Sequence, residues 1–264
     1  MSFDLAAYLA RVRLTAPTPA TASGLRALQQ AQLQAIAFEN LDPLTGRLPD
    51  LAPDALWRKL VTDRRGGYCF ELNGLFGQAL QALGFDARPV LARVRMGAPE
   101  GGARTHLAWI VALDGREWLA DCGFGGSGPR VPLPLDLGDH DDGRDRFRLV
   151  ADGEERVVEK AMPEGWFGLY GFDGQRPRPI DIEAANVVCA RWERVRFGSS
   201  LMLSRQLPDG RVSCLDRAGR TDRAAGLETW TLGSAAELHL RLARDFGIAA
   251  APELVAEAWA RLPA

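Results

Sequence analysis

The hydrophobic periodicity of the chain changes near Gly84, and this change limits the folds that the chain can adopt. Before Gly84, apolar residues recur every three or four positions, which predicts amphipathic helices at residues 3–12 and from about residues 23, 53 and 69. After Gly84, apolar and polar residues alternate over residues 87–96, 106–125 and 146–162, as is typical of β-strands. A chain with this order of patterns is expected to be α+β.

The C-terminal half of the chain contains loop, strand and helix patterns in turn. Residues 125–145 are rich in Pro, Gly and Asp, which predicts a long surface loop. Residues 196–221 are expected to form two or three further strands, and the segment from Ser234 to Leu262 returns to a helical period. We therefore expect a helical part, a β-rich part and a mixed part, in that order.

Composition excludes several kinds of partner. The net charge is −2 and the pI is about 6.0, so nothing favours binding to a nucleic acid. No apolar run is long enough for a membrane span, and the first residues lack the apolar core of a signal peptide, so a cytoplasmic location is expected. Four cysteines are widely spaced and form no C-x-x-C pair, so neither a metal site nor a disulfide framework is expected.

The segment RRGGYCFELNGLF, residues 64–76, places a cysteine where a turn becomes a helix. In the first turn of a helix, Cys69 would face unpaired N–H groups and the positive end of the helix dipole, which stabilise a thiolate. Gly66 and Gly67 would permit close backbone approach and positive φ, and Arg65 adds a positive charge. The alternative is a buried structural cysteine that follows a glycine-terminated helix. This segment alone fits both interpretations.

A thiolate nucleophile needs a base, and the chain has three histidines: His106, His140 and His239. Asp114-Gly115 predicts a hairpin with a two-residue loop. In that register, His106 lies opposite Gly123 and diagonal to Asp121 on the same face. The carboxylate of Asp121 would then orient the imidazole, as in a nucleophile–base–acid triad. The alternative is a surface strand histidine and an aspartate that only starts a turn.

Four motifs occur in an order and spacing that resemble the arylamine N-acetyltransferases. They are FENLD at residues 38–42, RGGYCFELNGLF at 65–76, THL at 105–107 and DCGFGG at 121–126. The resemblance is strong over residues 1–137 and weaker beyond. It implies a helical bundle at residues 1–85, an antiparallel β-barrel at 86–195 and an α/β lid at 196–264, with a triad arranged as in cysteine peptidases.

The resemblance also implies an activity. The family transfers an acetyl group from acetyl-CoA, its co-substrate, to small arylamine, arylhydrazine or N-hydroxyarylamine acceptors. The route is ping-pong, through an acetyl-cysteine. Carried over, Cys69 is the nucleophile, His106 the base and Asp121 its partner. Two alternatives remain: a macrolactam-forming amide synthase of the same fold, and a cysteine hydrolase or transglutaminase-like enzyme.

Other residues match the family with supporting roles. Glu39 and Arg65 match an ion pair that supports the turn of the nucleophile. Pocket-lining aromatic positions match Phe38, Phe124 and Phe197, and a loop near the coenzyme matches Gly125 and Gly126. The chain departs from the family over residues 186–200, which lack the usual His and Pro, and at Cys122, where a small apolar residue is usual. Three arginines are expected to alternate along a strand: Arg191, Arg194 and Arg196. They would form a solvated face or, alternatively, contact the phosphates of CoA.

Overall fold

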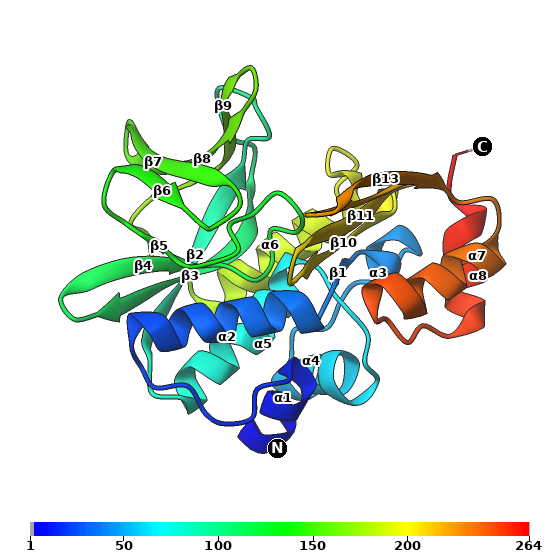
Figure 1. Ribbon diagram of the computed structural model, residues 1–264, viewed down its shortest axis with the longest axis horizontal. Helices are drawn as coiled ribbons and strands as arrows, with labels where there is room; N and C mark the ends of the chain where they lie inside the picture. The colour runs from blue at the N-terminus through cyan, green and yellow to red at the C-terminus, as the bar shows by residue number, and fades with distance from the viewer. Residues whose placement is uncertain (1–2, 264) are drawn as a thin grey trace.

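Helices come first in the computed structural model, which describes residues 3–263 (Figure 1). The Asp4 side chain caps the first helix by accepting a hydrogen bond from the Ala7 N–H. The second helix is capped by Thr21, two residues before the expected Ser23. The helices are α1 Leu5–Val12, α2 Ala22–Ala35, α3 Leu41–Leu44, α4 Pro53–Trp57 with its continuation η1 Arg58–Thr62, and α5 Cys69–Ala82.

An eight-stranded antiparallel sheet follows and curls into a nearly closed barrel, packed against α2 and α5 (Figure 1). Its strand order is β5-β4-β3-β2-β9-β8-β7-β6. The strands are β2 Asp86–Val94, β3 Arg104–Leu113, β4 Arg116–Ala120, β5 Leu133–Pro134, β6 Gly138–Asp141, β7 Arg146–Asp152, β8 Glu155–Met162 and β9 Gly165–Phe172. Because β5 and β6 fall within residues 125–145, the prediction of an uninterrupted loop there is wrong.

The hairpin of β3 and β4 has the register predicted from its Asp-Gly loop. Leu113 pairs with Arg116, and the ladder continues to the pair of Trp109 and Ala120. β4 ends at Ala120, so Asp121 leaves the ladder as the first residue beyond it. His106 and Asp121, which the sequence predicts to lie close together, therefore both lie beyond the last paired residues, at the open end of the hairpin.

A second antiparallel sheet has the order β1-β10-β11-β12-β13 and packs against the C-terminal helices (Figure 1). Three of its strands begin within residues 196–221, in agreement with the two or three expected there, and a fourth follows them. Its edge strand, β1, comes from the helical part, where Phe38 pairs with Ser204. The elements are β1 Phe38–Glu39, β10 Met202–Leu207, β11 Gly210–Leu215, β12 Ala218–Arg223, β13 Gly226–Thr231, α7 Ala235–Arg241 with η3 Leu242–Phe246, and α8 Pro252–Ala260. The proposed domain boundaries at residues 85 and 195 stay a prediction.

The segment between the sheets is helical, so the strand expected around the three arginines is wrong. α6 Pro179–Arg191 begins with proline at its first position, and Asp181 accepts a hydrogen bond from the Arg178 N–H. A short 3₁₀ turn, η2, follows at Arg196–Gly198. Polar and apolar residues alternate over residues 191–197 as in a strand, but in the structure this segment contains the end of α6 and the start of the 3₁₀ turn.

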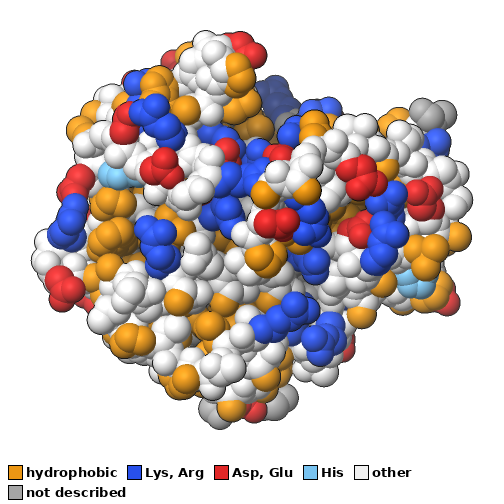
Figure 2. Space-filling view, viewed as in Figure 1, with side chains coloured by type: hydrophobic (Ala, Val, Ile, Leu, Met, Phe, Trp, Pro, Cys, Tyr) orange, Lys and Arg blue, Asp and Glu red, His pale blue; other side chains and the backbone are white. Residues whose placement is uncertain are grey.

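Arginines tie the barrel to the C-terminal sheet, and Figure 2 shows Lys and Arg side chains gathered along this junction. Arg144 pairs with Asp222 at 2.8 Å, and the guanidinium of Arg211 donates to the Gly126 carbonyl at 2.7 Å. Among residues 3–263, none of the helices is both long and apolar enough to cross a bilayer. In the same range, no three His, Cys, Asp or Glu side chains are grouped so that they could hold a metal ion.

Candidate active site

Cys69 is the first residue of α5 and is buried, with 4% of its surface exposed. The two preceding glycines bring the chain close to its neighbours. A Cβ on Gly66 would lie 2.3 Å from the Ala37 carbonyl oxygen, and one on Gly67 would lie 2.8 Å from a Glu71 carboxylate oxygen. Neither glycine has a positive φ, so that part of the prediction is wrong. Their role is close packing of the turn that positions the thiol.

His106 and Asp121 lie in direct contact at the open end of the β3–β4 hairpin. The distance from Nε2 of His106 to Oδ2 of Asp121 is 2.7 Å, and both side chains are 2% exposed. His106 acts on the Cys69 thiol, because its charge and hydrogen bonding lower the pKa of that thiol. A Cβ on Gly123 would lie 2.7 Å from the Cα of Cys69, so this glycine lets the start of α5 approach the hairpin. The three predicted residues thus lie together.

The Asp121 carboxylate is saturated with donors. Besides His106, Oδ2 accepts the Tyr170 hydroxyl at 3.0 Å, and Oδ1 accepts the Asn73 side-chain amide at 2.9 Å and the Gly123 N–H at 2.7 Å. Burial raises its pKa, but the attraction and hydrogen bond of His106 and these further donors outweigh burial and leave the pKa below its usual value. Asp121 is therefore a fixed negative charge beside the imidazole.

Charge separation is favoured between Cys69 and His106. Burial raises the pKa of the Cys69 thiol, but hydrogen bonds with Cys189 and His106 and the charge of His106 lower it to about 6. Burial lowers the pKa of His106, whereas the Asp121 charge and hydrogen bond raise it to about 10. Between those values the pair exists as thiolate and imidazolium, the reactive form of a cysteine nucleophile.

A buried network of ions supports the turn that carries Cys69. The guanidinium of Arg65 lies 2.7 Å from Glu39 and 3.2 Å from Asp42. Lys59 bridges Asp42 at 2.5 Å and Glu71 at 2.6 Å. The predicted pair, Glu39 and Arg65, is thus in contact, but sequence reasoning missed the three other members. These three residues, Asp42, Lys59 and Glu71, lie up to 27 positions from Cys69 in the sequence, and their contact is visible only in the folded chain.

We expect Arg65→Ala to be strongly destabilising. The Glu39 side chain has no exposed surface, so loss of Arg65 leaves a buried carboxylate without its charged partner. The free energy of unfolding should fall by about 3–5 kcal/mol in urea denaturation. The control is Arg223→Ala, which removes an ion pair with Asp209 whose side chains are 46% and 44% exposed and should cost about 0–1 kcal/mol. Equal losses in the two variants would contradict this role of Arg65.

The predicted pocket aromatics form two groups. The Phe124 ring stands edge-on to the His106 ring, with centroids 5.1 Å apart. Phe38 contacts Phe197 at a centroid distance of 5.9 Å. A Cβ on Gly125 would lie 3.6 Å from the Phe38 ring and 3.1 Å from the Ser204 hydroxyl of β10, so these groups adjoin one another. The loop continues into Gly126, whose carbonyl Arg211 binds.

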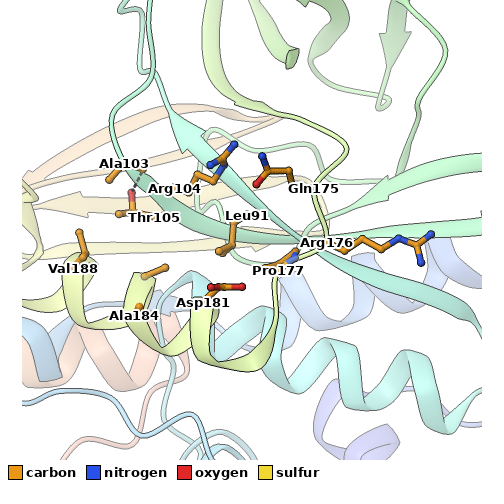
Figure 3. Close-up of a pocket in the computed structure, with 11 residues that line it drawn as sticks. Leu91, Ala103, Arg104, Thr105, Gln175, Arg176, Pro177, Asp181, Ala184 and Val188 are labelled. Atoms are coloured by element: carbon orange, nitrogen blue, oxygen red, sulfur yellow. Dashed lines mark hydrogen bonds between the residues drawn. The ribbon is translucent and has the colours of Figure 1, made fainter. Parts of the chain in front are cut away.

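A cavity of about 380 Å³ lies between the barrel and α6 (Figure 3). Its barrel side includes Leu91 and Thr105, and its helix side includes Ala184 and Val188, while Arg176 points away in Figure 3. Thr105 connects this cavity with the site, because its carbonyl oxygen accepts the Cys69 thiol at 3.6 Å, although Cys69 itself does not line the cavity. The predicted pocket aromatics are not among its lining residues. Sequence reasoning missed this cavity because α6 was not expected.

Sequence reasoning also missed the residues that hold the hairpin and α5 together. Asn73 donates to Asp121, accepts the Cys122 N–H at 3.0 Å, and thereby links α5 to the end of β4. Gln29 of α2 accepts the Asp121 N–H at 3.1 Å. The only available signal was their polarity on otherwise apolar helix faces.

A thiol at a helix N-terminus that faces a histidine–carboxylate pair is the arrangement of cysteine-dependent acyl-transfer and hydrolytic enzymes. The family model of N-acetyltransferases matches residues 21–255. The chain belongs to the arylamine N-acetyltransferase family. This membership confirms the resemblance seen in the motifs, and the α+β fold with its barrel agrees with it.

Individual relatives match over most of the chain. The arylamine N-acetyltransferase / N-hydroxyarylamine O-acetyltransferase of Salmonella typhimurium is 37% identical over 212 residues, 80% of this chain and 75% of that protein. The arylamine N-acetyltransferase of Escherichia coli is 34% identical over 246 residues, 91% of this chain and 87% of that protein. The solved structure of Mycobacterium marinum arylamine N-acetyltransferase in complex with CoA superposes with a TM-score of 0.91 at 33% identity, covering 98% of this chain and all of that one.

Proposed function

We propose that this protein transfers the acetyl group of acetyl-CoA to an arylamine or arylhydrazine through an acetyl-Cys69 thioester. The observation that carries this proposal is the buried pair of His106 and Asp121, whose imidazole lowers the pKa of the Cys69 thiol, in a member of this family. The complex of a relative with CoA supports the choice of donor. A reducing compartment such as the cytoplasm suits this chemistry, because the nucleophile must remain a free thiol.

The mechanism has two acyl transfers. The Cys69 thiolate attacks the acetyl carbonyl, the bond from that carbon to the CoA sulfur breaks, and CoA leaves as its thiol with a proton from the His106 imidazolium. The amine then attacks the acetyl-cysteine, His106 takes the amine proton, and Cys69 leaves as thiolate. Asp121 holds the imidazole orientation throughout.

Several residues support binding of a small aromatic acceptor. Phe124 lies against the His106 ring, and Phe38 and Phe197 adjoin it through the Gly125 turn. Together they offer flat apolar surface beside the base, which an aryl ring would cover. Gly125 and Gly126 are proposed to lie near the coenzyme, where their missing side chains leave the backbone accessible.

The test uses the wild-type protein with acetyl-CoA and no acceptor. Intact mass spectrometry should show one acetyl adduct, which an arylamine or arylhydrazine then removes. Initial rates at varied donor and acceptor should give parallel double-reciprocal lines. Intersecting lines would contradict the ping-pong scheme. If the protein, with its thiols reduced, forms no acetyl adduct, the result would favour the macrolactam-forming amide synthase or the cysteine hydrolase instead.

A further inference from the structure

Two thiols from different helices converge on one carbonyl group beside the site. The sulfur of Cys69, at the start of α5, and the sulfur of Cys189, near the end of α6, each lie 3.6 Å from the Thr105 carbonyl oxygen. Both residues are buried, with 4% and 1% of their surface exposed. None of the four family motifs, at residues 38–42, 65–76, 105–107 and 121–126, includes Cys189.

A carbonyl oxygen accepts protons but donates none. Once Cys69 is a thiolate, it has no proton for Thr105, and the Cys189 thiol is the S–H group next to both acceptors. We propose that Cys189 is a positioning residue whose S–H, directed at the Thr105 carbonyl in this structure, turns to the Cys69 sulfur once that thiol has lost its proton. The inference rests on the proposed role of Cys69 as nucleophile.

The position of Cys189 is fixed by its own helix. Three residues earlier, Asn186 donates to the Pro49 carbonyl at 3.0 Å and accepts the hydroxyl proton of Tyr68, the residue before Cys69. Val188, the neighbour of Cys189, lines the cavity between α6 and the barrel (Figure 3). α6 therefore supplies one wall of the cavity through Val188 and places the Cys189 thiol at the Thr105 carbonyl that the Cys69 thiol also contacts.

Among the titratable groups around Cys69, Cys189 is the neutral group that can donate a hydrogen bond to its sulfur. The hydrogen bond to Cys69, together with burial, raises the pKa of Cys189 well above its ordinary value, so this thiol keeps its proton. Burial likewise raises the pKa of Tyr68, whose proton is directed to Asn186. From β3, His106 supplies the positive charge, with Asp121 behind it. Cys69 thus has two titratable proton-bearing neighbours, a charged imidazole and a neutral thiol, in addition to the backbone N–H of Leu107.

The experiment measures the pH dependence of Cys69 alkylation by iodoacetamide, with the modified residue located by peptide mass spectrometry. The wild-type midpoint is expected near pH 6, where Cys69 loses its proton. Two donor-free variants are compared, because Cys189→Ala leaves a cavity whereas Cys189→Val fills it. Each should raise the midpoint by about one pH unit, the effect of losing one weak donor to a charged group. Cys189→Ser, which retains a donor, should stay near the wild-type midpoint.

The matched control is Cys214→Ala, which removes a buried thiol from the core of the C-terminal sheet and should leave the midpoint unchanged. Wild-type midpoints in both donor-free variants would overturn the proposal, and so would a Cys189→Ser midpoint raised as far as that of Cys189→Ala. This readout needs no acetyl donor. A midpoint shift without any acetyl adduct would therefore retain the role of Cys189 while rejecting the proposed acetyl transfer.

Discussion

Cys69→Ala is expected to abolish acetyl transfer and the acetyl adduct. The variant lacks the group that accepts the acetyl carbon, while His106 and Asp121 remain in contact at the hairpin. Removing the nucleophile of such a triad lowers the catalytic rate by about 10⁴-fold or more, because its members act as a unit. The measurement is intact mass after incubation with acetyl-CoA, together with kcat/KM for an arylamine.

Cys214→Ala is the matched control for this prediction. Its thiol is also buried, but it lies in the C-terminal sheet, where it donates to the Asp216 carbonyl. This variant should retain both the adduct and the transfer rate. An adduct of wild-type yield on Cys69→Ala would show that another thiol carries the acetyl group, and the assignment of Cys69 would be withdrawn.

Asp121→Asn is expected to lower kcat/KM by about 10³–10⁴-fold although it barely changes the shape of the side chain. Both carboxylate oxygens accept two donors, so in either orientation the new amide NH₂ meets groups that need an acceptor. If the amide donates to Nε2 of His106, the ring proton moves to Nδ1, the wrong tautomer for a base. The fixed charge that raises the pKa of His106 to about 10 is also lost.

The pH profile separates this effect from simple misfolding. Without the imidazolium, Cys69 loses its charged partner, so the midpoint of its alkylation should move upward from about pH 6. Asp142→Asn is the control, because Asp142 is a buried carboxylate that accepts the N–H groups of Arg130, Arg144 and Asp145 on the barrel. It should cost stability but leave kcat/KM unchanged. Activity of Asp121→Asn within tenfold of wild type would contradict the orienting role.

Features that depend on neighbouring residues were predictable. The shift from a helical period to alternation placed helices before the barrel, and the Asp-Gly loop predicted the register from Leu113–Arg116 to Trp109–Ala120. The glycine pair and the following apolar period placed Cys69 at a helix start. Each of these follows from propensity, side-chain period or turn geometry within a few residues, where the local backbone energy decides.

Local patterns gave wrong predictions in two segments, where the same residues fit more than one kind of secondary structure. Residues 191–197 alternate like a strand, yet they end α6 and enter a 3₁₀ turn. Residues 125–145 have loop composition but contribute two short strands to the barrel. In both segments, packing against the rest of the molecule outweighs a weak local preference.

The amino-acid sequence specifies the reactive groups and the short helices and strands that carry them. How these elements meet depends on packing between distant segments. Gly123 admits the start of α5, Asn73 joins α5 to Asp121, and α6 brings Cys189, 120 positions after Cys69, to the same Thr105 carbonyl. The reason is physical. Local conformation is set by adjacent residues, whereas contacts between distant segments depend on the complementary packing of whole surfaces, which no short pattern encodes.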